Sequence, residues 1–357
     1  MRKQRISVLS IVLLSILTFA NAADADESQE REGIWADSLT LKLAGERHEL
    51  LSAESTHGSL DSALQDIVHV LANCGQPRIS FLNAVGWSFD DAGATLEDAD
   101  ATWSLRVDGD GSSFSYRGNL DDEVAFTLAG ETTGIDDSTI RAEAENFING
   151  FILPLIPLGP DEEIVFLGTE AYGYTFLDPL SGRQWDEEIA AIAVFGRRVG
   201  SVPVVGPGSR VSIWLAGNLE VVAIDVDWPR LTGNGNFVYV MDRDDVWLRA
   251  EKLTGISSAD LENNLRLSRA NGIRMMECGY VDLGVALRQG APIQPGCLIY
   301  HDGVSPDGQP IHATYEIPIG DKVEEDCSWP AVSAVSGMPW IPCGPAVYLA
   351  EDLIFGD

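Results

Sequence analysis

The sequence predicts an α+β protein in which helices pack on antiparallel curled sheets, arranged as two or three units of a helix followed by strands. Apolar residues recur at helical spacing near residues 59–73, 138–151 and 257–271, and alternating segments typical of strands follow each stretch. With 357 residues, a hydrophobic fraction of 45%, 9 Trp and 12 Phe, the chain can bury a substantial core. These values exclude a wholly disordered chain.

The first helix is expected from Ser59 to Asn73. The Ser59 hydroxyl can accept a hydrogen bond from a backbone N–H at the helix start, and Gly75 can adopt the left-handed conformation that often ends a helix. One face carries the apolar stripe that would meet the core, namely Leu60, Ala63, Leu64, Ile67, Val68 and Leu71. This spacing predicts an amphipathic helix with one buried side.

Two further helices are expected. The second covers about 138–151, with Asp137 or Ser138 as its N-cap. The third starts at Ser257 and stops at Asn271-Gly272, a pair that favours a left-handed end. Each helix has an apolar face, so each is expected to pack on the strands that follow it.

Short alternating segments predict the strands, and two turns predict hairpins. The turns are Asp108–Gly111 and Asp242–Asp245, each flanked by two alternating segments. The expected strands are Thr102–Val107, Ser113–Tyr116, Ile164–Phe166, Ala171–Phe176, Ile189–Val199, Arg210–Leu215, Val221–Val226, Phe237–Met241, Val246–Ala250, Ile273–Gly279, Cys297–His301 and His312–Ile317. Neighbours along the chain are expected to pair antiparallel.

The first 22 residues have the features of a secretory signal peptide. Arg2, Lys3 and Arg5 precede the apolar run Ile6–Ala20, and Ala20-Asn21-Ala22 offers the small residues that a signal peptidase accepts. The apolar run is shorter than the roughly 20 residues needed to span a bilayer. We therefore expect cleavage and a secreted or periplasmic protein without an integral membrane span, with an uncleaved anchor as the alternative.

The length predicts more than one domain after the signal peptide at 1–22. Residues 23–35 are acidic and poor in apolar residues, which predicts a flexible leader. An N-terminal α+β unit is expected at 36–132, a second α+β unit at 133–235, and a C-terminal α+β unit with a Cys-containing tail at 236–357.

The charge of the chain is strongly negative. Lys and Arg total 23, whereas Asp and Glu total 55, which gives a formal net charge of −32 at pH 7. Proteins that bind nucleic acid neutralise phosphate with basic side chains, so this balance excludes that class. Adjacent acidic pairs such as Asp90-Asp91 and Glu324-Glu325 could be posed as acid and base, but in so acidic a chain we interpret them as solvated surface.

Three segments begin like known sites and then depart from them. Asp108–Gly111 opens like an EF-hand calcium loop, but the fifth and twelfth positions hold Ser112 and Asn119. His48-Glu49 opens like the metalloprotease H-E-x-x-H motif, but Ser52 stands where the second His is needed. Gly206–Gly208 is followed by a strand rather than a phosphate-binding helix. The sequence therefore predicts no catalytic, cofactor-binding or metal-ligating residue.

Four of the five cysteines lie near the C-terminus, and export permits disulfides. Four cysteines allow three connectivities, and short loops are the easiest to close, which favours Cys278–Cys297 and Cys327–Cys343. Cys74, near the end of the first helix, is expected to be a buried free thiol. A zinc site is the alternative, although the cysteines lack C-x-x-C spacing and the five His form no ligand pattern with them.

A possible partner surface lies in the tail. Trp329, Met338 and Trp340 occur in a Pro-rich segment between Cys327 and Cys343. Aromatic residues displayed on a disulfide-closed loop can form a binding surface, with simple packing of the loop as the alternative.

The most distinctive passage is Val194–Leu215 followed by Asn218–Trp228. It resembles the strand–turn–strand core of PepSY-like domains in exported bacterial proteins, with Ala216–Leu219 in place of the acidic-Gly turn of those domains. Further similar passages bring the resemblance to roughly residues 138–319, namely Gly272–Tyr280, Ile293–Tyr300 and Ala313–Ile319.

This resemblance makes the 133–235 unit PepSY-like and implies an extracytoplasmic, non-catalytic module, which in some members inhibits or assists peptidases and in others regulates. We therefore expect an exported, non-enzymatic binding or regulatory protein that needs no cofactor and acts through a protein or peptide partner, with regulation of a peptidase as one such role. The alternatives are an exported hydrolase with a glycosidase-like carboxylate pair and an envelope-surface structural or adhesive component.

Overall fold

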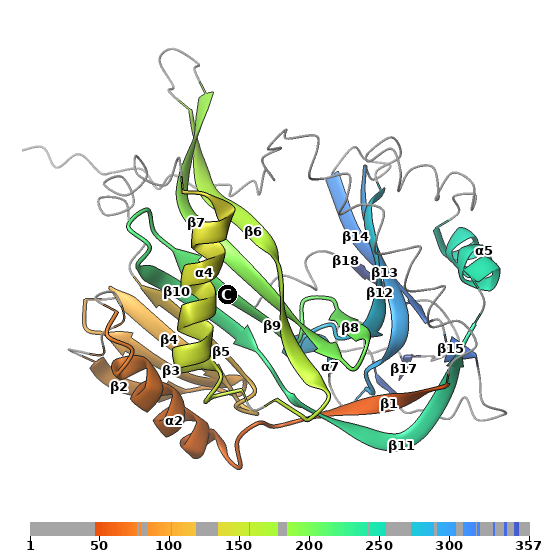
Figure 1. The fold of residues 1–357 in the computed structure, drawn as a ribbon, viewed down its shortest axis with the longest axis horizontal. Coiled ribbons are helices and arrows are strands. Elements are labelled where there is room, and N and C mark those ends of the chain that lie inside the picture. Colours follow the sequence, from red (N-terminus) through yellow and green to blue (C-terminus); the bar gives the residue numbers. More distant parts are fainter. Residues whose placement is uncertain are drawn as a thin grey trace, which may run out of the picture.

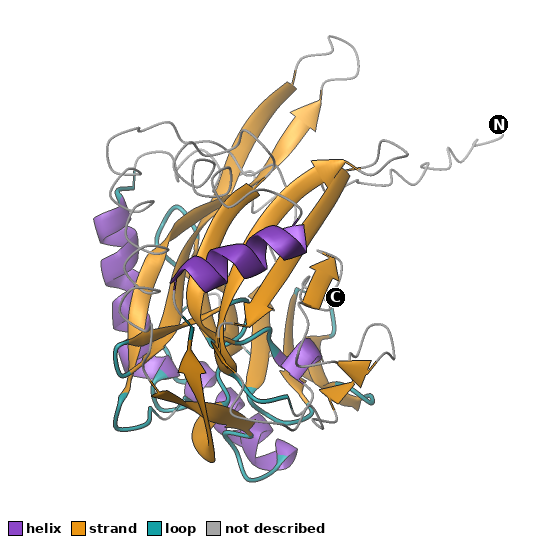
Figure 2. Ribbon diagram, turned by 90° about the vertical axis from the view of Figure 1, so that its right-hand side faces the viewer, coloured by secondary structure: helices purple, strands orange, loops and turns teal. Residues whose placement is uncertain are grey.

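The described chain consists mostly of β-strands (Figure 2). A computed structural model describes residues 47–76, 79, 81, 84–100, 102–118, 135–156, 158–177, 184–241, 243–254, 273–288, 291–304, 310–318, 320–321, 331–332, 339–340 and 346–349. A single 13-stranded sheet dominates, and a three-stranded and a two-stranded sheet accompany it. The predicted signal peptide and leader lie outside the described residues.

The large sheet has the strand order β18-β14-β13-β12-β8-β7-β9-β10-β5-β4-β3-β2, and β6 pairs with β7 beside this path. Its first nine strands along the chain are β2 (Ala84–Phe89), β3 (Gly93–Asp98), β4 (Trp103–Asp108), β5 (Ser113–Gly118), β6 (Glu162–Leu177), β7 (Gln184–Val199), β8 (Val202–Val205), β9 (Arg210–Leu215) and β10 (Val221–Asp227). The long β6–β7 hairpin extends beyond the neighbouring strands at the top of Figure 1.

The remaining strands follow β10 in sequence. The large sheet continues with β12 (Ile273–Val281), β13 (Gln294–Val304), β14 (Pro310–Pro318) and β18 (Ala346–Leu349). The three-stranded sheet contains β1 (Arg47–Glu54), β11 (Arg230–Val240) and β15 (Gly320–Asp321), and the two-stranded sheet contains β16 (Ala331–Val332) and β17 (Pro339–Trp340).

The expected fold class is wrong. The chain does not form successive helix-then-strand units, because strands from the three predicted units pair directly with one another in one large sheet. For example, β10 pairs antiparallel with β5, and β8 pairs parallel with β12. The alternation of apolar and polar residues predicts where a strand lies in the sequence. It does not predict which strand from a distant part of the chain pairs with it.

The first two expected helices are present. Helix α2 (Leu60–Ala72) starts at the N-cap Ser59, whose side chain accepts a hydrogen bond from the Ser62 backbone N–H at 3.2 Å. Helix α4 (Asp137–Phe147) has Asp136 as its N-cap, one residue before the expected Asp137 or Ser138, and Asp136 accepts a hydrogen bond from the Thr139 backbone N–H at 2.9 Å. A π-helical turn, η1 (Ile148–Ile152), continues it. The expected third helix lies outside the described residues.

One expected hairpin is confirmed and the other is wrong. Strands β4 and β5 pair antiparallel around the Asp108–Gly111 turn. In the second expected hairpin, Phe237–Val240 is a strand as expected and ends β11, but Val246–Ala250 belongs to helix α5 (Arg243–Thr254) instead of a second strand. Asp244 and Asp245 occupy its first turn, where negative charge favours a helix, and strong helix formers follow them. Local helix propensity therefore outweighed the short alternating pattern.

The main core lies between α2, α4 and one face of the strands from β3 to β10. Helix side chains such as Ile67 and Phe147 are buried with strand side chains such as Leu105 and Ile213. Figure 1 shows α2 and α4 lying on this part of the sheet, away from β12, β13 and β14. A second, smaller cluster near β12 contains Val205, Val281, Leu298 and the partly buried Leu283.

Candidate functional sites

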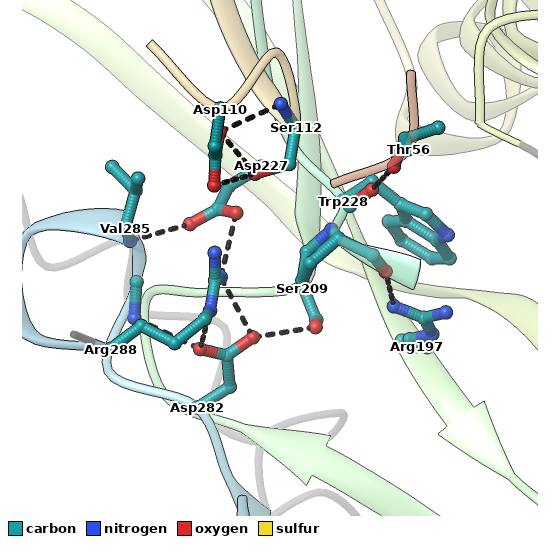
Figure 3. Close-up of polar contacts among 12 residues, drawn as sticks. Thr56, Asp110, Ser112, Arg197, Ser209, Asp227, Trp228, Asp282, Val285 and Arg288 are labelled. Carbon is teal, nitrogen blue, oxygen red and sulfur yellow. Dashed lines mark hydrogen bonds and ion pairs between the residues drawn. The ribbon is translucent and has the colours of Figure 1, made fainter. Parts of the chain in front are cut away.

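A buried charged cluster lies where two parts of the large sheet meet. We call Ser209, Asp227, Asp282 and Arg288 the junction cluster. Asp227 ends β10, and Ser209 lies in the turn between β8 and β9. Asp282 directly follows β12, and Arg288 ends the short helix α7 (Val285–Arg288). Figure 3 shows the side chains converging from these separate segments.

One guanidinium joins the two carboxyl groups of the cluster. Nη2 of Arg288 donates to Oδ1 of Asp227 at 2.7 Å and to Oδ2 of Asp282 at 3.0 Å. Nε of Arg288 donates to Oδ1 of Asp282 at 3.0 Å, and Oγ of Ser209 donates to Oδ2 of Asp282 at 2.7 Å (Figure 3). Asp227, Asp282 and Arg288 are each at most 8% exposed, so these contacts are shielded from water.

Backbone groups and small residues complete the junction cluster. The Val285 N–H donates to Asp227 at 3.1 Å, and the Gly284 N–H donates to Asp282 at 3.1 Å. A Cβ at Gly208 would overlap the Asp282 carboxylate, so this close approach requires glycine. The turn between β8 and β9 is therefore shaped around the Asp282 side chain.

Burial dominates the electrostatics of the cluster. It raises the pKa of Asp227 to about 7, because desolvation outweighs the favourable interaction with Arg288. Burial alone would lower the pKa of Arg288, but the carboxyl groups of Asp282 and Asp227 outweigh it and raise that pKa. Arg288 is therefore the permanent cation of the cluster.

A second buried guanidinium supports the adjoining part of the sheet. Arg197 on β7 is 2% exposed and donates to the Pro229 carbonyl at 2.6 Å and to Glu162 at 2.5 Å. It also lies over the ring of Trp228, 4.9 Å from the centroid. Burial lowers the pKa of Arg197, and Glu162 opposes that shift. These contacts fasten β6, β7 and the end of β10 together.

The second candidate site is an exposed strand at one end of the large sheet. Among the described strands, β2 pairs only with β3. Its Val85 and Phe89 are 71% and 62% exposed, which is high for large apolar side chains. Phe89 is the register partner of the buried Ala94 on β3. Phe89 therefore lies on the same face of the sheet as the main apolar core, to which Ala94 belongs. We call β2 and its outer side the β2 edge.

Acidic side chains flank the β2 edge. Asp90 and Asp91 are exposed in the turn that follows β2, and Glu97 and Asp100 are exposed near the opposite end of β3. Oδ2 of Asp90 lies 3.6 Å from Nη1 of Arg106, and this guanidinium offsets part of the negative charge of Asp90. The surroundings of the exposed apolar residues are therefore negative at both ends.

The expected cysteine pair Cys278–Cys297 forms a disulfide between β12 and β13, where the two residues are register partners. Cys327 and Cys343 lie outside the described residues, so their pairing stays a prediction. Cys74 is buried and free, and burial raises the pKa of its thiol. This raised pKa makes Cys74 a weak nucleophile at neutral pH.

The predicted partner surface remains a prediction. Trp329 and Met338 lie outside the described residues, and Trp340 belongs to β17, where it is the register partner of Ala331. Within the described ranges, no group of three or more His, Cys, Asp or Glu residues could hold a metal ion. Over the same residues, no helix combines the length and the apolar character needed to cross a membrane.

Sequence reasoning did not single out Asp227, Asp282 or Arg288. Asp282 and Arg288 lie six residues apart, but Asp227 is 61 residues from Arg288, and the two carboxyl groups look like any others among 55. The available signal was Gly206–Gly208, which we interpreted only as a turn and which approaches Asp282 closely. The β2 edge was also missed, because no expected strand covered residues 84–89.

Comparison with known proteins gives little further information. No protein-family model matches the chain, so the PepSY-like resemblance stays a prediction, and no curated protein matches it. Among solved structures, that of an uncharacterized protein from Eubacterium rectale aligns with a TM-score of 0.44 and 9% identity, covering 78% of this chain and 87% of that chain. A likeness this distant carries no argument about function.

Proposed function

We propose that this chain is an exported binding protein without catalytic activity that captures an extended segment of a partner protein at the β2 edge. The observation that carries this proposal is the exposure of Val85 and Phe89 on a strand at the end of the large sheet. An edge strand offers backbone N–H and C=O groups for pairing with another strand. Proteins that bind peptides by strand addition gain affinity from this pairing and specificity from the alternate side chains.

The chemistry around the β2 edge defines the partner segment. Trp87 and Phe89 share the core-side face, so alternate apolar residues of an added strand would pack against them. The exposed acidic residues at both ends favour Lys or Arg on either side of that apolar stretch. The proposed ligand is therefore an extended peptide with alternating apolar residues and basic flanks.

Export is part of the same proposal. Residues 1–22 have the charge and apolar pattern of a signal peptide, and the Cys278–Cys297 disulfide suits an oxidising compartment. A peptidase or another envelope protein could supply the extended segment. The tail residues Trp329, Met338 and Trp340 remain a second candidate surface for the same partner.

The geometry favours binding over glycoside hydrolysis. A glycosidase presents two carboxyl groups to its substrate. Asp227 and Asp282 lie close together, but both are buried and both hydrogen-bond to Arg288. Their contacts stabilise the junction between strands, which is a structural role.

A labelled peptide tests the proposal directly. The probe is fluorescein-labelled Lys-Lys-Val-Thr-Val-Thr-Val-Lys-Lys, and its binding to the mature chain is measured by fluorescence anisotropy. We expect saturable binding that weakens with added salt, because charge contributes to the interaction. Hydrogen exchange of the complex is expected to show new protection in residues 84–89.

Two variants distinguish peptide binding at the β2 edge from non-specific binding to other exposed apolar residues. Phe89→Ser is expected to weaken binding at least tenfold, because it removes an apolar contact without adding charge. Leu248→Ser is the matched control, since Leu248 is 48% exposed on α5, and it is expected to bind like the unaltered protein. Equal loss in both variants, or protection elsewhere than β2, would contradict the proposal.

A further inference from the structure

The two parts of the large sheet meet through a short ladder. Strands β8 and β12 are paired by only two register pairs, Tyr280 with Val204 and Val281 with Val205. Two backbone hydrogen bonds extend this contact, from Asp282 N–H to the Val205 carbonyl at 2.9 Å and from Gly208 N–H to the Asp282 carbonyl at 3.0 Å. The junction cluster begins at the point where this ladder ends.

The charges of the junction cluster do not balance when all its groups are ionised. Arg288 supplies one positive charge, whereas Asp227 and Asp282 supply two negative charges, and all three are buried. An uncompensated charge in a buried site has a large desolvation cost. Full ionisation therefore weakens the cluster, and one proton on a carboxyl group restores neutrality.

The neighbouring charged groups do not remove this imbalance. Arg197 interacts electrostatically with Asp282, but Glu162 pairs with Arg197 and balances its charge. Asp110, in the turn between β4 and β5, lies on another side of Asp227 (Figure 3), and Asp108 at the end of β4 interacts electrostatically with Asp110 and Arg288. Arg210 is the register partner of Asp227 on β9, but its guanidinium lies 3.8 Å from Glu277 on β12. Within the described residues, Arg288 is the cation that contacts Asp227.

We propose that the junction cluster makes the contact between the β8–β9 turn and the β12–α7 segment depend on pH. With Asp227 protonated, Arg288 neutralises the remaining carboxylate and the junction is closed. When Asp227 ionises, the excess buried negative charge loosens Asp282 and α7 from the end of β10 and from the β8–β9 turn. The protein thus has a tighter junction at mildly acidic pH than at mildly alkaline pH.

The direction follows from the burial of Asp227. Burial raises its pKa to about 7 in the folded protein, above the ordinary value of 3.8. The folded state therefore binds this proton more strongly than the unfolded state. Its stabilising contribution is fully present below pH 3.8 and is lost as the pH rises towards and through 7.

Hydrogen exchange between pH 5.5 and 8.5 tests the proposal on the full mature chain. After correction for the intrinsic exchange rate, protection of the Gly208, Gly284 and Val285 amides is expected to fall at least tenfold over this range. Amides of β4 and β5 serve as the internal reference. In Asp227→Asn, which is neutral at every pH, the protection of the three amides is expected to remain nearly constant.

Asp225→Asn is the matched control. Asp225 lies two residues away on β10 and contacts Arg117 at 2.6 Å outside the cluster, so its replacement should leave the pH dependence unchanged. If Asp227→Asn does not fold, carboxyl carbon NMR of the unaltered protein provides the decision. An Asp227 titration near pH 7 with coupled shifts of the Val285 and Gly284 amides supports the proposal. Titration below pH 5, or equal pH profiles in all variants, would overturn it.

Discussion

Two regions of the large sheet are stabilised in different ways. From β3 to β10, helices α2 and α4 cover one face, and their side chains join a broad apolar core with the strands. Around β12 and β13, the described residues share a small apolar cluster, a disulfide and the junction cluster. The comparison teaches that one continuous ladder can combine a region held mainly by apolar burial with one that relies on crosslinking and buried ions.

The largest effect is expected where the two regions meet. Arg288→Leu leaves the Asp227 and Asp282 carboxyl groups buried without their cation, so the free energy of unfolding is expected to fall by about 3–5 kcal/mol at pH 8. Urea denaturation measures this loss. Arg117→Leu is the control, since it removes a half-exposed ion pair with Asp225 and should cost at most about 1 kcal/mol. Similar losses in both variants would show that the junction cluster has no special role.

A pair of core substitutions compares the two apolar clusters. Leu105→Ala in the broad core is expected to lower the free energy of unfolding by about 2–5 kcal/mol, because the buried methyl groups are lost and a cavity remains. Leu298→Ala lies in the small cluster and is expected to cost less, near the lower end of that range. A larger loss for Leu298→Ala in chemical denaturation would reverse the comparison.

Removing the disulfide tests the region around β12 alone. Replacing both Cys278 and Cys297 with Ser is expected to lower stability by about 3 kcal/mol, as the loop they close has a sequence separation of 19. Hydrogen exchange should increase in β12 and β13 more than in β4 and β5. Equal stability of the oxidised and reduced forms of the unaltered protein would contradict this prediction.

The smallest effect concerns the helix-covered region. Ser59→Ala removes the hydrogen bond that caps α2 and is expected to lower stability by about 1 kcal/mol, measured by thermal or urea unfolding. Ser62→Ala is the control, because Ser62 is exposed in the first turn and is not the cap. No difference between the two variants would show that the cap contributes nothing.

Local features could be predicted from the sequence. The Ser59 cap and the apolar spacing after it determined α2, and the Asp108–Gly111 turn between alternating residues determined the β4–β5 hairpin. These signals lie within one element or between adjacent elements. Short sequence separation allows the side chains themselves to specify the contact.

Other features could not be predicted in this way. An alternating segment does not specify its partner, so neither the pairing of β8 with β12 nor the position of β2 at the end of the sheet followed from the pattern. In the segment after Asp242, helix propensity and pattern disagreed, and the helix α5 formed. The general expectation of successive helix-and-strand units failed because strands that are distant in sequence pair directly in one large sheet.

By itself, the sequence determined the acidity of the chain, its signal-like first 22 residues, α2 and the β4–β5 hairpin. Tertiary structure alone decided that Asp227, Asp282 and Arg288 share one buried site, and that Val85 and Phe89 remain exposed. The physical reason is that ionisation and exposure depend on which distant segments surround a side chain. Long-range strand pairing sets those surroundings, and no local spacing encodes it.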